Sequence, residues 1–277
     1  MSEASRLGRR TSLDPFHSFK AMQKQGWAHF APVEMFTTGP AARLVKFAGV
    51  QVGQTVLDVA CGTGVVAVTA ARMGASVRAL DLTPELLERA RYNSQTAEVQ
   101  VDWQEGDVEK LPFDDGEFDV VLSQFGHMFA PRPAIALAEM MRVLKPGGTI
   151  AFSTWPPELF TGRMFMLVAS HMPALPPGAS PPPQWGDQRI VRERLGQAVS
   201  DIAFERATMH GAALSPQHFR AFSEHTVGPL VKLVENLSAN DPATLAGFRR
   251  EFDALAAEFF RDNFVQMDYL MTRATKS

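Results

Sequence analysis

Residues 55–71 read TVLDVACGTGVVAVTAA, an apolar run that ends in a glycine turn and then resumes at helical spacing. An almost continuous apolar run is typical of a parallel strand that is buried on both faces of a sheet. Gly62 and Gly64 permit a tight turn in which backbone N–H groups approach a ligand. The valines and alanines that follow predict a helix, whose N-terminus favours negative charge. This stretch therefore predicts a strand, turn and helix with a ligand site at the turn.

Two classes of ligand use such a turn, and the surrounding residues distinguish them. GTGVVA at residues 62–67 matches the dinucleotide pattern G-x-G-x-x-G/A, and Asp81 lies at a suitable distance to bind a ribose. Asp58, however, ends the strand, where its carboxylate would repel a pyrophosphate. S-adenosylmethionine carries an ammonium, a sulfonium, one carboxylate, a ribose diol and an adenine amine, which suit an acidic site. We therefore predict a methyl-donor site, with an NAD(P)-binding oxidoreductase as the alternative.

The composition of the 277 residues limits the cellular context. A hydrophobic content of 45% can supply a large core, and a net charge of −3 gives no basic field that would attract nucleic acid or an anionic membrane. Cys61 is the one cysteine, so no internal disulfide can form, which is typical of a reducing compartment. No apolar run approaches the ~18 residues that span a bilayer, and the start lacks a signal-peptide core. We expect a cytoplasmic protein with no integral membrane segment and no nucleic-acid partner.

Strands and helices alternate after the first unit, which is typical of a doubly wound parallel sheet. Four further strands are predicted, at residues 76–80, 98–105, 118–123 and 149–155. We divide the chain into four parts. They are a helical segment or lid (1–47), a donor-binding core (48–155), a variable substrate segment (156–202), and the end of the core with a helical insertion at 215–263 (203–277). Residues 1–12, with Arg6, Arg9 and Arg10, predict a mobile start to which we assign no function.

Three aspartates follow successive strands of this predicted sheet. Asp58, Asp81 and Asp107 all lie near carboxyl ends, which meet at one edge of a parallel sheet. We expect Asp58 near the ammonium and Asp81 on the ribose diol. We expect Asp107 to accept from the adenine amine while the Val108 backbone donates to the ring. Asp119 begins a strand at the opposite edge, so we interpret it as structural.

Four blocks, in this order along residues 50–155, resemble the class I S-adenosylmethionine-dependent methyltransferases, particularly the ubiquinone and menaquinone biosynthesis group. They are VLDVACGTG at 56–64, ALDLTPELLERAR at 79–91, EGDVEKLPFDDGEFDVVLS at 105–123 and MMRVLKPGGTIAFSTW at 140–155. The resemblance implies a Rossmann-like, mostly parallel sheet of seven strands that ends in a reversed hairpin, which here would be residues 203–211 and 264–274. It implies that S-adenosylmethionine is bound by Asp58, Ala60, Cys61, Gly62, Thr63, Gly64, Asp81, Leu82, Gly106, Asp107, Val108, Ser123 and Gln124.

Departures from related groups narrow the acceptor. Methyltransferases of nucleic-acid bases resembling this fold carry Asn or Asp followed by Pro-Pro-Tyr or Pro-Pro-Phe after the fourth strand, whereas this chain has SQFG at 123–126. Arsenite methyltransferases use several thiols, whereas Cys61 is alone. We therefore predict a small organic acceptor of quinol, phenolic, lipid-like or secondary-metabolite type. A non-catalytic regulator that binds S-adenosylmethionine is a further alternative.

The segments outside the core carry the acceptor site in this interpretation. Residues 159–172 predict an apolar helix, residues 173–183 are too rich in proline for regular structure, and residues 215–263 predict helices that begin at Ser-Pro, Gly-Pro and Asp-Pro pairs. This insertion predicts a lid over the acceptor or, alternatively, the surface of a homodimer. His127, after the fourth strand, is the one candidate general base, with loop packing as its structural alternative. We expect no metal ion.

Overall fold

The computed structural model describes residues 14–277, so the predicted mobile start at 1–12 lies outside the described residues. Its centre is a sheet with the strand order β3-β2-β1-β4-β5-β8-β6, and a short β7 pairs with β8. The strands are β1 (Thr55–Val59), β2 (Ser76–Asp81), β3 (Asp102–Glu105), β4 (Phe118–Gln124), β5 (Leu144–Thr154), β6 (Val199–Ala212), β7 (Phe260–Arg261) and β8 (Phe264–Lys276). The first five are parallel, and β8 is antiparallel to both β5 and β6. Leaving out the two-residue β7, β8 is the seventh strand along the chain, and the order 3-2-1-4-5-7-6 confirms the predicted Rossmann-like sheet with its reversed hairpin.

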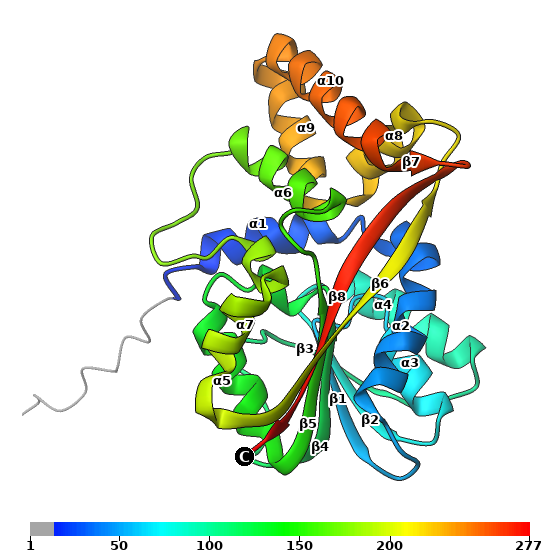
Figure 1. Cartoon of the computed structure of the whole chain (residues 1–277), viewed down its shortest axis with the longest axis vertical. Helices are drawn as coiled ribbons and strands as arrows, with labels where there is room; N and C mark the ends of the chain where they lie inside the picture. The colour runs from blue at the N-terminus through cyan, green and yellow to red at the C-terminus, as the bar shows by residue number, and fades with distance from the viewer. Residues whose placement is uncertain (1–13) are drawn as a thin grey trace, which may run out of the picture.

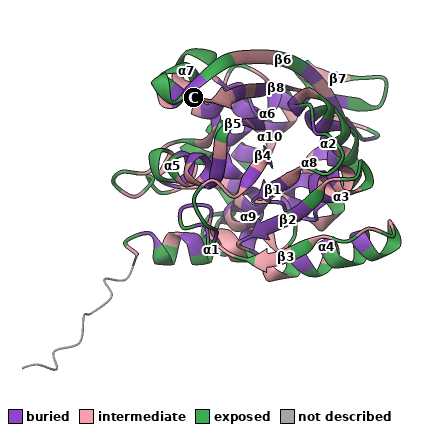
Figure 2. Cartoon of the chain, turned by 90° about the horizontal axis from the view of Figure 1, so that it is seen from below, coloured by how far each residue is buried: buried purple, intermediate pink, exposed green. Residues whose placement is uncertain are grey.

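Helices cover both faces of the sheet (Figure 1). One face carries α2 (Glu34–Ala48), α3 (Val65–Arg72) and α4 (Pro84–Thr96), and the other carries α5 (Pro133–Val143) and α7 (Gln188–Leu195). The central strands β1 and β4 lie between these layers and are mostly buried, as Figure 2 shows in purple. In β1, residues Val56, Leu57 and Val59 have no exposed surface, which explains the continuous apolar run.

A group of helices lies beyond the carboxyl ends of the strands (Figure 1). It comprises α1 (His17–Trp27), α6 (Phe160–Ser170), α8 (Pro216–Thr226), α9 (Gly228–Asn240) and α10 (Pro242–Phe259). The starts of α8 and α10 are capped as the sequence indicates, since Ser215 Oγ accepts from the His218 N–H and Asp241 Oδ1 from the Thr244 N–H. Where α1 meets α9, a Cβ on Gly26 would lie 3.0 Å from the Gly228 carbonyl oxygen, so this close approach requires glycine.

The long hairpin of β6 and β8 joins the two halves of the molecule. Both strands run from the sheet up to the distal helices (Figure 1), and α8, α9 and α10 form the connection between them. The apolar faces predicted in the 215–263 insertion are buried within the chain, with Leu230, Leu233, Phe248 and Phe252 all fully covered. These residues therefore need no second copy to cover them.

Three local features differ from the sequence predictions. The third strand begins at Asp102 and not at residue 98, because Glu98 adopts a φ of 56° in a turn after α4. The fifth strand begins earlier, at Leu144, and includes the KPGG segment. Helix α7 was not predicted; Asp187 caps it by accepting from the Arg189 N–H at 2.8 Å. Two short 3-10 helices flank α7, η3 (Pro182–Gly186) before it and η4 (Gly196–Ala198) after it. A further one, η1 (Ala31–Val33), lies between α1 and α2.

Among residues 14–277, no helix combines the length and apolarity that a bilayer crossing requires.

Candidate functional site

The glycine turn lies where the strand order of the sheet reverses. Strand β1 lies between β2 and β4, and ligands of open parallel sheets bind outside the carboxyl ends at such a position. Gly62 and Gly64 have φ values of 55° and 77°, in the left-handed region that favours glycine. A Cβ on Gly62 would meet no atom within 4 Å, whereas one on Gly64 would lie 2.4 Å from the Trp103 ring. Gly62 thus leaves open space at the turn, and Gly64 allows tight packing.

Asp81 holds the turn in place. Its Oδ2 accepts from the Gly62 N–H and its Oδ1 from the Thr83 N–H, both at 2.8 Å. Burial raises the pKa of Asp81, while these backbone donors lower it. Thr83 precedes α4 as predicted, but its own side chain makes no capping hydrogen bond. Each carboxylate oxygen can accept a second hydrogen bond, so Asp81 retains capacity for a ligand hydroxyl.

Asp58 is fully buried at the end of β1. Its Oδ2 accepts from the Ala67 N–H in the first turn of α3 at 3.0 Å, and its Oδ1 has no hydrogen-bond partner among the described residues. Burial raises the pKa of Asp58 well above its usual range, and the neighbouring Asp81 carboxylate raises it further. Such a carboxyl group would be ionised most easily beside a bound cation.

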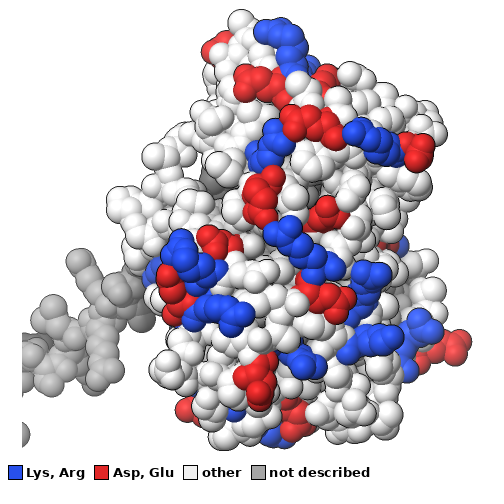
Figure 3. Space-filling model, viewed as in Figure 1, with Lys and Arg blue, Asp and Glu red and all other residues white. Residues whose placement is uncertain are grey.

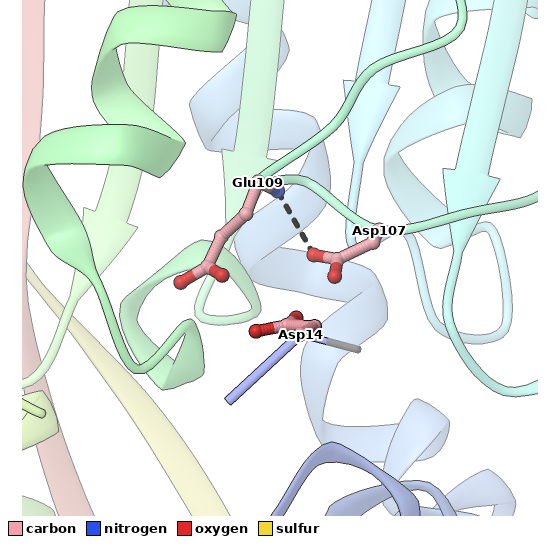
Figure 4. A group of neighbouring side chains, drawn as sticks. All are labelled: Asp14, Asp107 and Glu109. Carbon is pink, nitrogen blue, oxygen red and sulfur yellow. Dashed lines mark hydrogen bonds between the residues drawn. The ribbon is translucent and has the colours of Figure 1, made fainter. Parts of the chain in front are cut away.

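Asp107 lies in a group of three carboxylates that converge from separate segments (Figure 4). Asp107 and Glu109 follow β3, while Asp14 precedes α1. The arrangement resembles a metal site, but Lys20 of α1 places its Nζ at 2.5 to 2.6 Å from an oxygen of each carboxylate. Arg132 pairs with Glu109 at 2.6 Å. Two side-chain cations therefore offset most of the negative charge of the three carboxylates, and the ion pairs fasten α1 to the core.

One cavity connects this edge of the sheet to the distal helices. Of the residues predicted to bind the donor, all except Gly64 and Ser123 line it. Gly64 packs on Trp103, as described above. The Ser123 hydroxyl donates to the Val59 carbonyl oxygen at 2.9 Å and accepts from the His127 N–H, within the core. Gln124 lines the cavity; its Nε2 donates to the Thr37 carbonyl oxygen, and its Oε1 has no partner among the described residues.

The far end of the cavity is aromatic and apolar. Its walls come from the α1–α2 region, the loops after β4 and β5, α6, α8, β6 and β8, and include Trp27, Phe30, Phe36, Phe125, Phe129, Trp155, Phe160, Met164, Phe165, Met209, Phe219, Phe222 and Met267. Phe125 and Trp155 stack with ring centroids 3.9 Å apart. Ala60 and Phe125 have φ values of 51° and 63°, an unfavourable conformation for residues other than glycine that often marks functional sites.

Comparisons with known proteins agree with this geometry. A family model described as "Methyltransferase domain" matches residues 57–152. An uncharacterized protein of Mycobacterium tuberculosis is 37% identical over 84% of this chain and 85% of its own length. The ubiquinone biosynthesis O-methyltransferase of Xanthomonas campestris is 42% identical, over 37% of this chain and 43% of its own length. The chain belongs to the class I S-adenosylmethionine-dependent methyltransferases.

A solved structure supports the fold of this methyltransferase over most of its length. A putative methyltransferase from Bacillus halodurans superposes with a TM-score of 0.56 at 22% identity, covering 85% of this chain and 98% of that one. The Xanthomonas match, by contrast, spans less than half of either protein. The cofactor of the methyltransferase is S-adenosylmethionine, as the family implies, whereas its acceptor must be inferred from the cavity.

The residues around the glycine turn fit that cofactor. The unpartnered Oδ1 of Asp58 suits an ammonium, which would offset the buried negative charge. The first turn of α3 contains no acidic residue and follows Gly64, which has no side chain; its Ala67 N–H is bonded to Asp58, and Val65 and Val66 line the cavity. The N–H groups of Val65 and Val66 suit a carboxylate. A pyrophosphate would instead meet the Asp58 and Asp81 carboxylates, which is why this methyltransferase differs from dinucleotide-binding enzymes.

His127 does not lie in the cavity of the methyltransferase. It belongs to η2 (His127–Phe129), is fully buried, and packs its ring against Phe152 and Trp185 at centroid distances of 4.7 and 4.8 Å. Burial, with a smaller contribution from Arg194, lowers the pKa of His127 to about 3. Neither ring nitrogen has a partner among the described residues. The ring is enclosed and lines no part of the cavity, so the geometry favours the packing alternative, and the role of His127 as a general base stays a prediction.

Sequence reasoning missed two groups of cavity residues. Lys20 and Gln23 of α1 line the cavity, where Lys20 pairs with Asp107 and Gln23 donates to the Phe129 carbonyl oxygen. A lone lysine in an amphipathic helix gives no signal of its distant acidic partners. Thr161 and Ser223 line the aromatic end, within segments whose apolar spacing predicted packing. The proline pairs at the helix starts were the one local signal that these segments form an organised unit.

Proposed function

We propose that this methyltransferase transfers the methyl group of S-adenosylmethionine to a small, largely apolar organic molecule. The observation that carries the proposal is the continuity of one cavity, which runs from the acidic glycine turn to a chamber of aromatic side chains. A small molecule bound in the chamber would meet the donor inside the protein. The enclosure fits a quinol, phenolic, lipid-like or secondary-metabolite acceptor better than a polymer.

The proposed chemistry is an in-line displacement. When bound, S-adenosylmethionine supplies a methyl group on a positively charged sulfur; the acceptor atom forms a bond to the methyl carbon as the sulfur–carbon bond breaks. Holding the two reactants in contact can itself supply much of the acceleration. Asp58, Asp81 and the N-terminus of α3 would orient the donor, and the aromatic walls would orient the acceptor and exclude water.

We assign no side chain to the removal of a proton from the acceptor. Solvent would take that proton, or the acceptor would have none to lose. All the ionisable side chains that line the cavity lie at its donor end, which is the end beside the glycine turn. They are Lys20, Asp58, Cys61, Asp81 and Asp107. Burial raises the pKa of the Cys61 thiol well above its usual range, so this group is a poor base near neutral pH. An acceptor with an acidic hydroxyl, or one whose nucleophile carries no proton to lose, suits such a chamber.

We also propose a role for each segment of the chain, the kind of partner it has and where it is located. We assign donor binding to residues 48–155, acceptor binding to 156–202 and the 215–263 insertion, and a covering role to the described part of 1–47. Positive and negative side chains alternate on the face in Figure 3, which offers no basic stripe for nucleic acid. The lone Cys61 favours a reducing, cytoplasmic location. The burial of the insertion's apolar faces favours a monomeric site over a homodimer.

Isothermal calorimetry tests the donor site, and turnover tests the enzyme. We expect S-adenosylmethionine and S-adenosylhomocysteine to bind with micromolar-range Kd, whereas NADH does not bind. We expect release of S-adenosylhomocysteine when a panel of phenols and quinols is added. Binding of NADH in place of S-adenosylmethionine would favour the oxidoreductase alternative. Donor binding without turnover on any acceptor would favour the regulator.

A further inference from the structure

One hydroxyl group at the aromatic end of the cavity lacks a partner. Thr161 is the second residue of α6 and lines the cavity, and its side chain is 94% buried, with 6% exposed. Its Oγ has no hydrogen-bond partner among the described residues. A buried hydroxyl without a partner costs free energy, so it indicates either a functional demand or a ligand that completes it.

A second hydroxyl in the same wall provides the contrast. Ser223 of α8 also lines the cavity and is 1% exposed, but its Oγ donates to the Phe219 carbonyl oxygen at 2.8 Å. The fold therefore satisfies one of the two buried hydroxyls and leaves the other available. Local helix geometry permits the bond at Ser223, because a hydroxyl can donate to the carbonyl four residues earlier. Thr161, in the first turn of α6, has no such helical carbonyl behind it.

The surroundings of Thr161 favour an oxygen atom with partial negative charge. The first turn of α6 contains no acidic residue, and Leu159, which precedes it, makes no side-chain capping bond. The positive end of the helix dipole is thus not offset by a side chain. Phe160, Met164 and Phe165 of the same helix line the cavity, so this end of α6 borders the chamber.

The rest of the chamber selects against anionic acceptors. Its walls hold aromatic rings, including the stacked pair of Phe125 and Trp155, whose ring planes differ by 13°. The charged side chains of the cavity all belong to the donor end, as described above. A phosphate on the acceptor would lose its hydration without gaining a counter-ion. A flat aromatic skeleton would instead stack against these rings.

We propose that Thr161 is a specificity-determining residue whose hydroxyl donates a hydrogen bond to a carbonyl or phenolic oxygen of a flat, aromatic acceptor. This inference rests on the proposed methyltransferase function and adds the acceptor class to it. The oxygen is held by one side chain and the end of one helix, while the carbon skeleton is held by stacking. Acceptors that lack such an oxygen, or that carry a negative charge, would bind weakly.

Two probes of matched shape test the proposal. The protein is saturated with S-adenosylhomocysteine, and the quenching of tryptophan fluorescence is titrated with 2-naphthol and with 2-methylnaphthalene, which lacks the oxygen. Thr161→Val removes the hydroxyl at constant shape, Thr161→Ser restores it, and Ser223→Ala removes the hydroxyl that already has a partner. We expect Thr161→Val to weaken 2-naphthol about 3- to 10-fold, the effect of one neutral hydrogen bond, and to leave 2-methylnaphthalene unchanged. Thr161→Ser and Ser223→Ala should bind 2-naphthol like the wild type.

Calorimetry with S-adenosylhomocysteine on every variant distinguishes a failure of the methyltransferase proposal from a failure of the role proposed for Thr161; these are the two levels that the outcomes below address. If the wild type binds S-adenosylhomocysteine but 2-naphthol binds equally well to Thr161→Val, the role of Thr161 is overturned and the methyltransferase proposal stands. An equal loss for both probes would show a packing defect and also overturn it. Failure of 2-naphthol to bind the loaded wild type would overturn the acceptor class. Failure of S-adenosylhomocysteine to bind would overturn both levels.

Discussion

The two ends of the cavity are built in opposite ways. At the donor end, acids and backbone groups bond to one another within the single stretch of residues 58–107, as in Asp81 with Gly62 and Thr83. At the acceptor end, side chains from segments along the whole chain meet through apolar packing. A site made within one stretch of strand ends and turns is encoded in recognisable motifs, whereas a site made by packing exists only once the chain has folded.

The contrast extends to what each end can recognise. The donor end has buried carboxyl groups and directed N–H groups, which in our proposal select a zwitterionic ligand. The acceptor end has aromatic rings and thioethers, and thioethers adapt to irregular shapes, so we expect this end to tolerate a wider range of ligands.

The largest effect should follow Asp81→Ala at the donor end. The change removes the acceptor of the Gly62 and Thr83 N–H groups together with the proposed ligand of the ribose, so the turn loses its support. We expect the affinity for S-adenosylhomocysteine to fall about 100-fold, because hydrogen bonds to a charged group are the stronger kind. Calorimetry measures this. Asp102→Ala, at the exposed start of the neighbouring strand, is the matched control and should change the affinity less than twofold.

If both variants bound equally well, the donor end would not depend on its local bonds and the contrast between the two ends would fail. A specific loss at Asp81 would instead show that a contiguous motif carries most of the donor affinity.

An intermediate effect should follow His127→Phe, behind the acceptor end. The folded chain holds His127 neutral, with a pKa of about 3, below the usual 6.5. Between these values the unfolded chain binds a proton that the folded chain does not, so wild-type stability falls as the pH falls below 6.5. Phenylalanine has no group that titrates, so the variant does not lose this stability. When the pH is lowered from 8 to 5, the free energy of unfolding of the variant should rise by about 2 kcal/mol relative to that of the wild type.

Urea unfolding at pH 8, 6.5 and 5 checks this expectation. Parallel stability curves for the two proteins would mean that the folded protein protonates His127, which would favour its predicted role in acid–base chemistry. Donor affinity should be the same in both proteins, because the ring packs against Phe152 and Trp185 and away from the cavity.

Much of the donor end could be predicted from sequence, because it is built from strand ends and turns within one stretch of the chain. Strand ends and glycine turns are local features, and parallel strands bring their carboxyl ends together whatever else the chain does. Asp58, Asp81 and Asp107 therefore all line the cavity as expected, and Asp119 bonds to Thr55 at the opposite edge as expected. The length of β5 and the existence of α7 escaped prediction because packing, not local propensity, determines them.

The acceptor end could not be predicted, because apolar spacing looks the same whether a face packs or lines a chamber. In α6, Phe160 and Met164 border the cavity while Val168 belongs to the core, within one periodic pattern. His127 illustrates the converse case. A histidine in the loop after β4 has the chemistry of a base, but only the folded packing shows that its ring is enclosed.

The smallest of the three effects should follow Lys20→Met, which tests whether the donor end is complete within the core. Lys20 lies in α1, outside the contiguous motifs, and pairs with Asp14, Asp107 and Glu109. Its replacement leaves neighbouring carboxylates with less neutralising charge, so α1 should detach more readily from the rim of the site. We expect the affinity for S-adenosylhomocysteine to fall about 5- to 10-fold by calorimetry. Lys24→Met, one turn further along α1 and paired with the half-exposed Glu105, should change it less than twofold. Equal affinities in the wild type and both variants would confine the donor site to the core; a specific loss at Lys20 would show that even the local end depends on one long-range contact.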